Sequence, residues 1–133
     1  MTTLRLAGHD VRPPVVLAAL LVLGAAAALV VGGHAPWWVL PLGVLGPDLA
    51  FLAAVGSPAP EERGAMPPRA VAPYNAVHHP AVAAVCTLLA GLLAGPTLVA
   101  LGLAWCSHIV WDRAVGYGLR TPEGHIRPVT AAR

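Results

Sequence analysis

Four long runs of apolar residues, separated by short polar or turn-forming segments, dominate this chain. Each run is close to the roughly 20 residues that an α-helix needs to cross a bilayer. The runs cover residues 14–32, 37–56, 71–94 and 97–117. The pattern predicts an all-α protein: a polytopic integral membrane four-helix bundle that forms a single transmembrane domain over residues 1–133.

Composition favours a membrane protein over a water-soluble domain. The 133 residues are 57% hydrophobic and only 11% charged, with a mean hydropathy of +0.72, whereas soluble domains are roughly 25% charged. A net charge of +2 without a basic cluster argues against a nucleic-acid partner. A cleaved signal peptide is the competing interpretation of the first run, although that run is overlong for one and more spans follow.

The arginines predict how the chain is oriented in the membrane. They precede the first run, separate the second from the third, and lie at or after the end of the fourth: Arg5, Arg12, Arg63, Arg69, Arg113, Arg120, Arg127 and Arg133. The other two connections, residues 33–36 and 95–96, contain none. Because Arg accumulates in cytoplasmic loops, we expect a multi-pass membrane protein with both termini in the cytoplasm.

Ionisable residues inside the runs gather toward the predicted cytoplasmic ends. They are Asp48 in the second run, His78 in the third, and His108 and Asp112 in the fourth. Ionisable groups within a span are costly and usually face a bundle interior or a cavity. We expect these four residues to be catalytic and to surround one cavity. Either His78 or the adjacent His79 can face it, and Tyr74, one turn before His78, favours His78.

Other residues near these groups are candidates for substrate contact: Tyr74, Asn75, Trp105, Trp111 and Tyr117. Pro47 and Pro80 also adjoin the site, and an interior proline bends a helix and frees a carbonyl. We therefore expect a polar chamber that opens at the cytoplasmic interface. A purely structural role stays open for Asp112 as an ion-pair partner of a nearby arginine, and for His108 as a link between helices.

Three segments of the chain resemble a known family. They are Gly-Pro-Asp-Leu at 46–49, Tyr-Asn-Ala-Val-His at 74–78 with Pro80, and the stretch from Trp105 to Arg120 that contains His-x3-Asp-Arg-x2-Gly-Tyr-Gly-Leu. They are similar to the small bacterial membrane proteins grouped as domain of unknown function 4260. The family commonly has Ser where this chain has Ala50 and a different ending where it has residues 121–125. The resemblance implies a membrane fold, a place in the bacterial inner membrane and a shared site, and it implies no activity.

The site admits three hypotheses of function. The first is an enzyme that uses two carboxyls in contrasting surroundings, Asp48 deep in an apolar surround and Asp112 near arginines at the interface. It would carry out acid/base chemistry on a lipophilic small molecule, by isomerisation or cyclisation of an isoprenoid or polyketide-like chain, or by hydrolysis. The second is a metal-dependent membrane hydrolase, with Asp48, His78, His108 and Asp112 as ligands for Zn²⁺, Fe²⁺ or Mn²⁺. The third is a small transporter or assembly subunit, although transport favours polar groups near the midplane.

The expected partners are the lipid bilayer and the lipophilic substrate, and a homodimer is a further possibility. Gly91 and Gly95 have the GxxxG spacing that brings membrane helices together. The spacing leaves a homodimer open, although the pair lies close to a helix end.

Overall fold

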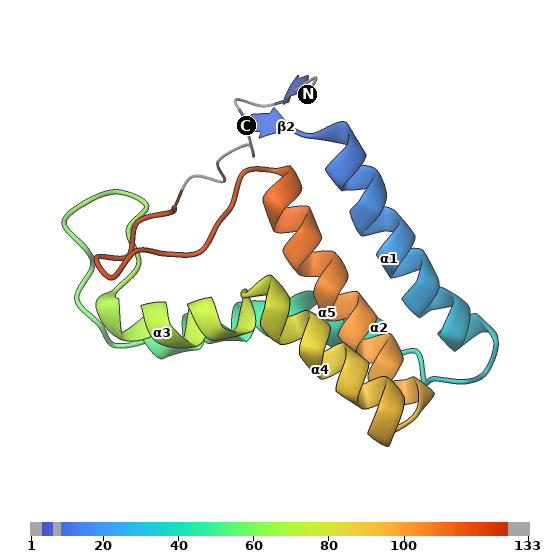
Figure 1. Ribbon diagram of the computed structural model, residues 1–133. Coiled ribbons are helices and arrows are strands. Elements are labelled where there is room, and N and C mark those ends of the chain that lie inside the picture. The colour runs from blue at the N-terminus through green and yellow to red at the C-terminus, as the bar shows by residue number, and fades with distance from the viewer. Residues whose placement is uncertain (1–3, 7–8, 128–133) are drawn as a thin grey trace.

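The computed structural model describes residues 4–6 and 9–127, and helices make up most of this part of the chain (Figure 1). A short antiparallel hairpin, β1 (Leu4–Leu6) and β2 (His9–Val11), comes first. It is followed by α1 (Pro13–Val31), α2 (Val39–Leu45), the 3-10 helix η1 (Gly46–Ala54), α3 (Pro68–Val77), α4 (Pro80–Leu93) and α5 (Pro96–Ala114). The predicted all-α class is confirmed. Arg133, one of the eight arginines used to predict the orientation in the membrane, lies outside the described residues.

Helix α1 is continuous and lies on the outside of the molecule, along α5 (Figure 1). Ala19 and Ala26 are its buried residues, and their small side chains allow the two helices to approach closely. The hydroxyl of Ser107 on α5 donates a hydrogen bond to the Ala19 carbonyl over 3.0 Å. The Arg12 N–H donates to the Ala114 carbonyl, also over 3.0 Å. The start of α1 therefore lies beside the end of α5, and the two helices are antiparallel.

The second predicted span, residues 37–56, is not one α-helix. The α-helical part ends at Leu45, and the chain continues as a 3-10 helix from Gly46 to Ala54. Pro47 has no N–H to donate to the preceding turn, which explains why the α-helical hydrogen bonding stops there. Together the two pieces form an apolar helix over Val39–Ala54 that is shorter than a membrane span.

The third predicted span, residues 71–94, is also broken. Helices α3 and α4 meet at an angle of 44°, with His78 and His79 at the junction. Pro80 is the first residue of α4, where a proline is tolerated because that N–H would have no partner in the helix. The His79 ring caps α4, since its Nδ1 accepts a hydrogen bond from the Ala81 N–H over 3.3 Å.

The structure supports fewer complete spans than the sequence predicts. Among the described helices, α1 is long and apolar enough to cross a membrane by itself, and α3 with α4 forms a second candidate if the bent pair is one span. Helix α5 has the length, but its second half carries His108, Asp112 and Arg113, and it is not among the candidates. Length and composition therefore identify one or two of the four predicted spans.

Helix α5 is the centre of the packing. It contacts α1, α2 and α4, while α3 packs against η1. The buried residues of α5 are mostly small: Ala100, Gly102, Ala104, Ser107, Ile109 and Ala114. Large apolar side chains instead lie on the outside of α1, η1 and α4, including Leu17, Leu21, Leu52, Leu88 and Leu92. An exterior of this kind is unusual for a soluble monomer.

The two glycines of the GxxxG pair do not share a helix face. Gly91 lies in α4, whereas Gly95 lies beyond its end with a φ of 89°. A Cβ built on Gly91 would lie 3.7 Å from Val99 Cγ2, so this glycine faces α5 of the same chain. A homodimer stays a prediction, and these glycines do not form the helix face on which it rested.

The segment after α5 folds back over the loop that precedes α3 (Figure 1). The Met66 N–H donates to the Gly124 carbonyl over 3.0 Å. Gly124 has a φ of 93°, and a Cβ there would collide with the Met66 backbone. The Arg120 guanidinium is buried and donates through Nη1 to the carbonyls of Gly64 and Gly124. The loop that carries Arg63 thus lies beside the segment that carries Arg120, whereas Arg69 lies in the first turn of α3.

Candidate functional site

Four side chains from three parts of the chain meet at one point. They are Asp48 on η1, His78 at the end of α3, and His108 and Asp112 on α5. The Nε2 atoms of His78 and His108 are 3.2 Å apart. His78 Nε2 is also 3.5 Å from Asp48 Oδ1 and 3.8 Å from Asp112 Oδ2. His108 Nε2 is 3.6 Å from the same two oxygens. We call this group the His/Asp cluster.

His78 is held in one orientation and one protonation pattern. Its Nδ1 lies 3.0 Å from the Tyr74 carbonyl oxygen. A carbonyl only accepts hydrogen bonds, so Nδ1 carries the proton and, in the neutral ring, Nε2 presents a lone pair to the cluster. The Tyr74 ring stacks on the imidazole at 3.8 Å between centroids. His78 is 1% exposed, while His79 is exposed and caps α4. His78 is therefore the histidine that faces the site.

The break between α3 and α4 builds the site as much as the side chains do. The last carbonyls of a helix have no partner within it, and here side chains of α5 supply them. Trp105 Nε1 donates to the Val77 carbonyl over 2.7 Å, and Arg113 Nη2 donates to the His78 carbonyl over 3.2 Å. The second guanidinium nitrogen of Arg113 donates to the Tyr117 carbonyl over 2.7 Å. The junction is thereby fixed to α5 on both sides of His78.

The two carboxyls differ in exposure, in the opposite sense to the prediction. The sequence places Asp48 deep in an apolar surround and Asp112 near the interface. In the structure the Asp48 side chain is 48% exposed and the Asp112 side chain 15%. The 3-10 helix η1 carries Asp48 on the outside of the molecule, whereas Asp112 belongs to the central helix. Asp48 therefore forms the open side of the site.

Three of the four groups fit one metal ion. Asp48 Oδ1, His78 Nε2 and His108 Nε2 all lie within 4.8 Å of one another, and Asp112 is not a member of that group. Their mutual separations are 3.2, 3.5 and 3.6 Å. Tetrahedral ligands at about 2.0–2.2 Å from a metal lie about 3.3–3.6 Å from one another. Two imidazoles and a carboxylate suit Zn²⁺, Fe²⁺ or Mn²⁺.

The contact of His78 with Tyr74 adds to this fit. A metal-binding histidine commonly donates its other ring N–H to a carbonyl or carboxylate, which fixes the tautomer and aims the free nitrogen. Here the free Nε2 of His78 is within 4 Å of two carboxylate oxygens, which in their ionised form only accept hydrogen bonds. A proton or a metal cation between these atoms is needed to make the arrangement favourable.

The residues predicted to contact substrate lie in different surroundings, and that role stays a prediction for each of them. Tyr74 is buried against His78. The Asn75 amide is engaged by the Arg120 backbone, with Nδ2 donating to its carbonyl over 2.9 Å and Oδ1 accepting from its N–H over 2.7 Å. Trp105 lines an apolar pocket, and Trp111 lines a second cavity together with His108. Tyr117 is 40% exposed.

The structural importance of Arg113 and Arg120 was not predicted from the sequence. Both contributed to the predicted topology and were candidate ion-pair partners of Asp112, whereas their guanidinium groups donate hydrogen bonds to backbone carbonyls. The Arg120 guanidinium also lies over the Tyr74 ring, 5.4 Å from its centroid, on the chain of contacts that leads to His78. The position of Arg113 directly after Asp112 is the signal that could have pointed to the site.

Comparisons with known proteins agree with the resemblance noted from the site segments. A family model described as Domain of unknown function (DUF4260) matches residues 15–127, which include all four cluster residues. No curated protein and no solved structure matches the chain. The family description carries no activity, and the geometry of the cluster is therefore the basis for a proposed function.

Proposed function

We propose that this chain, which belongs to the DUF4260 family, is a small bacterial inner-membrane enzyme that uses a divalent metal to hydrolyse a lipophilic substrate. The observation that carries the proposal is the triangle formed by Asp48 Oδ1, His78 Nε2 and His108 Nε2, with sides of 3.2, 3.5 and 3.6 Å. The hydrogen bond from His78 Nδ1 to the Tyr74 carbonyl supports it, because it leaves Nε2 free to bind a metal.

Each residue of the cluster has a distinct role in this proposal. A metal ion held by the three ligands would lower the pKa of a bound water and polarise the bond to be cleaved. Asp112 lies outside the ligand group, with its Oδ2 3.6 Å from His108 Nε2, and would serve as the general base that accepts a proton during hydrolysis. Asp48, the more exposed carboxyl, marks the side from which substrate arrives.

The membrane assignment is supported by the outer surface and by the placement of the arginines. Exposed leucines cover α1, η1 and α4, and apolar side chains facing outward are what a bilayer requires. The start of α1, the end of α5 and the loop before α3 all carry arginines. A backbone hydrogen bond holds the start of α1 beside the end of α5. We propose that both termini are cytoplasmic, that all four apolar runs lie in the membrane, and that the bent and 3-10 segments among them line the site.

Reporter fusions test this topology. A phosphatase that is active only in the periplasm, fused after residue 133 or inserted at Arg63, should be inactive, and the same reporter inserted at Gly33 should be active. Phosphatase activity at residue 133 or Arg63 would contradict the proposed orientation. Inactivity at all three positions, with the protein in the soluble fraction, would contradict the membrane assignment itself.

Metal analysis tests the enzyme proposal. We expect the protein purified in detergent, stripped with a chelator and reloaded with Zn²⁺, Fe²⁺ or Mn²⁺, to hold one ion per chain and to hydrolyse p-nitrophenyl decanoate. His108→Ala should lose the ion and the activity, and His79→Ala, the matched control at a capping histidine, should keep both. Activity that persists in metal-free protein would overturn the metal mechanism.

Acid/base catalysis without a metal is the second candidate, and the 3.2 Å contact between the two Nε2 atoms favours it specifically. One proton shared by the two rings would explain that contact, and the pair could then donate and accept protons during isomerisation or cyclisation of an isoprenoid or polyketide-like chain. A protein that holds no metal but converts such a chain would support this candidate. A protein that does neither would favour a transporter or an assembly subunit.

The Asp48→Asn variant tests whether the Asp48 carboxyl takes part in catalysis or only stabilises the fold. The carboxyl is 48% exposed, so a neutral amide of the same shape should change the free energy of unfolding by less than about 0.5 kcal/mol. We expect activity to fall at least about 100-fold, because the amide is a poor metal ligand and cannot transfer a proton. Thermal stability in detergent and hydrolysis are measured in parallel. Full activity in Asp48→Asn would remove Asp48 from the catalytic residues.

A further inference from the structure

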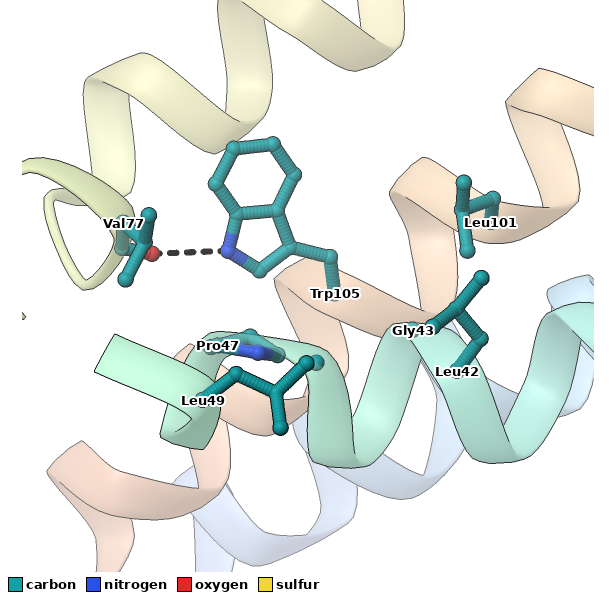
Figure 2. Close-up of a pocket in the computed structure, with 8 residues that line it drawn as sticks. Leu42, Gly43, Pro47, Leu49, Val77, Leu101 and Trp105 are labelled. Atoms are coloured by element: carbon teal, nitrogen blue, oxygen red, sulfur yellow. Dashed lines mark hydrogen bonds between the residues drawn. The ribbon is translucent and has the colours of Figure 1, made fainter. Parts of the chain in front are cut away.

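We infer that the apolar pocket between α2, η1 and α5 binds one hydrocarbon chain of the substrate, with the polar end of that chain at the His/Asp cluster (Figure 2). The inference rests on the proposed function and gives it a substrate class: a molecule with a single linear acyl or alkyl chain next to the bond that is cleaved. Four observations support it, namely the position of the pocket, its lining, its opening and its size.

The pocket adjoins the cluster on three elements at once. Pro47 in its wall directly precedes Asp48, and Val77 directly precedes His78. Trp105 lies one helical turn before His108 on α5. Figure 2 shows Pro47, Val77 and Trp105 around the same space. The cluster residues do not line the pocket themselves, so a chain lying in it would have its end one residue or one helical turn along the backbone from the three proposed metal ligands.

The lining is apolar, and the indole N–H of Trp105 already donates a hydrogen bond within the protein. Leu42, Leu49 and Leu101 contribute aliphatic surface. Trp105 Nε1 donates to the Val77 carbonyl over 2.7 Å, the hydrogen bond drawn in Figure 2, so the indole offers its ring rather than its N–H to an occupant. Burial of apolar surface, at about 0.8 kcal/mol for each methylene, is then the main source of binding energy.

The pocket is closed on one side and open on the apolar exterior. Leu42 and Leu49 at its rim are 46% and 57% exposed. On the inner side, a Cβ built on Gly43 would lie 2.5 Å from Ala104 Cβ and 2.6 Å from the Leu101 carbonyl oxygen, which shows that α2 and α5 are in direct contact. A ligand therefore enters sideways, from the part of the surface that we assign to lipid.

The size of the pocket favours a single chain over a helix of a second copy. Its volume is about 280 Å³, which is room for roughly nine groups the size of a water molecule at about 30 Å³ each. A methylene is of similar size, so the pocket holds a segment of one hydrocarbon chain. A helix with its side chains is about 10–12 Å across and does not fit.

Gly46 offers a variant that fills the pocket without disturbing the fold. It lines the pocket, its φ of −55° suits any residue, and a Cβ there would meet only Leu42 Cδ1, at 3.9 Å. Gly46→Leu should therefore place a side chain where the ligand chain lies. Gly24→Leu is the matched control, because a Cβ at Gly24 on α1 meets nothing within 4 Å and this glycine does not line the pocket.

The experiment is photolabelling of the full chain in phosphatidylcholine nanodiscs with a decanoic acid that carries a mid-chain diazirine. In wild type and Gly24→Leu we expect saturable labelling of pocket residues, competed by unlabelled decanoic acid. Gly46→Leu should lower it at least fivefold, while labelling of the exposed leucines of α4 stays constant as an internal reference. Leu49→Trp, which narrows the rim, should also lower it and serves if Gly46→Leu does not fold.

The outcomes separate this inference from the proposed function, because labelling is measured in metal-free protein and in Asp48→Asn as well. Saturable labelling without metal-dependent hydrolysis would leave the chain site standing and remove the hydrolase proposal. Metal binding and hydrolysis of p-nitrophenyl acetate and decanoate at equal rates, with no saturable label, would overturn the chain site alone. Pocket residues that crosslink to a second copy of the chain would assign the pocket to a dimer and would also overturn it.

Discussion

Helix α1 and the α3–α4 pair are two apolar stretches of this chain that serve different purposes. Helix α1 runs without interruption from Pro13 to Val31, and its buried residues are two alanines. The α3–α4 pair is bent by 44° at His78 and His79, and it carries a histidine that is 1% exposed. The first helix contributes an outer surface, and the second contributes the site.

The two stretches differ in their backbone as well as in their hydrophobicity, because α3 is less apolar than α1. An unbroken helix pairs its interior carbonyls with its own N–H groups, and it presents only side chains to its neighbours. At the α3–α4 break, the carbonyls of Val77 and His78 accept hydrogen bonds from Trp105 and Arg113. The Tyr74 carbonyl, one turn earlier, fixes the His78 ring. A break in an apolar helix thus supplies the fixed acceptors that orient a polar site.

The largest effect is expected from His78→Ala. The substitution removes a proposed metal ligand and empties a buried position, so we expect activity to fall more than about 100-fold, beyond the 10–100-fold typical of groups that only orient a ligand. The free energy of unfolding should fall by about 2–4 kcal/mol from the cavity. Metal content, hydrolysis rate and thermal stability in detergent measure the three effects.

His79→Ala is the matched control for this comparison. It removes the neighbouring ring, which caps α4 through the Ala81 N–H. Loss of a helix cap costs about 1 kcal/mol, and metal content and activity should not change. Equal loss of activity in both variants would mean that the break itself, rather than the His78 ring, supports function.

Pro80→Ala tests whether the bend is needed. Alanine restores an N–H that can bond the Ala76 carbonyl, which favours a continuous helix through the junction and draws the carbonyls of Val77 and His78 away from α5. We expect metal affinity to fall about tenfold, as for other changes that misalign a ligand. Pro96→Ala, at the first position of α5, should leave it unchanged. An unaltered affinity in Pro80→Ala would show that packing alone holds the bend.

Arg113→Lys should have a smaller effect. The guanidinium bridges the carbonyls of His78 and Tyr117, at 3.2 and 2.7 Å, and a single ammonium is not shaped to reach both. Losing one such hydrogen bond should lower the free energy of unfolding by about 1.5–3 kcal/mol, and activity by only a few-fold. Arg69→Lys is the control, because Arg69 makes one exposed bond, to the Ala53 carbonyl. Equal stability of both variants would contradict the bridging role.

The sequence predicted the residues of the site better than the paths of the helices that carry them. Asp48, His78, His108 and Asp112 meet as expected, because ionisable groups in apolar runs have few favourable places other than beside one another. The choice between His78 and His79 required the structure, since adjacent residues on a helix point in different directions and the position of the neighbouring helices decides between them. The 3-10 geometry of η1 was not predicted, and it placed Asp48 on the outside instead of the interior.

The predicted membrane spans also agree with the structure only where the helix path is regular. Helix α1 was predicted within a residue or two because nothing in its run competes with a regular helix. The runs over 37–56 and 71–94 are also largely apolar, but they break at Pro47 and at Pro80. The sequence indicated that these prolines bend the chain, and it did not indicate how far. That angle depends on tertiary contacts such as those of Trp105 and Arg113 with the α3 end.

The smallest effect is expected at the outer surface of α1. Leu21 is 65% exposed, and if lipid surrounds it, Leu21→Ala exchanges one apolar surface for another. The free energy of unfolding should then change by less than about 0.5 kcal/mol, as for surface positions in general. If another protein chain buried this face instead, the same substitution would leave a cavity and cost about 2–5 kcal/mol.

Ala26→Leu is the counterpart on the same helix, at a position that is 0% exposed because the rest of the chain covers it. It should be destabilising by about 1–3 kcal/mol from overpacking. Thermal unfolding of both variants in detergent and in nanodiscs measures the difference, and a Leu21→Ala loss as large as that of Ala26→Leu would show that α1 is not simply a lipid-facing wall.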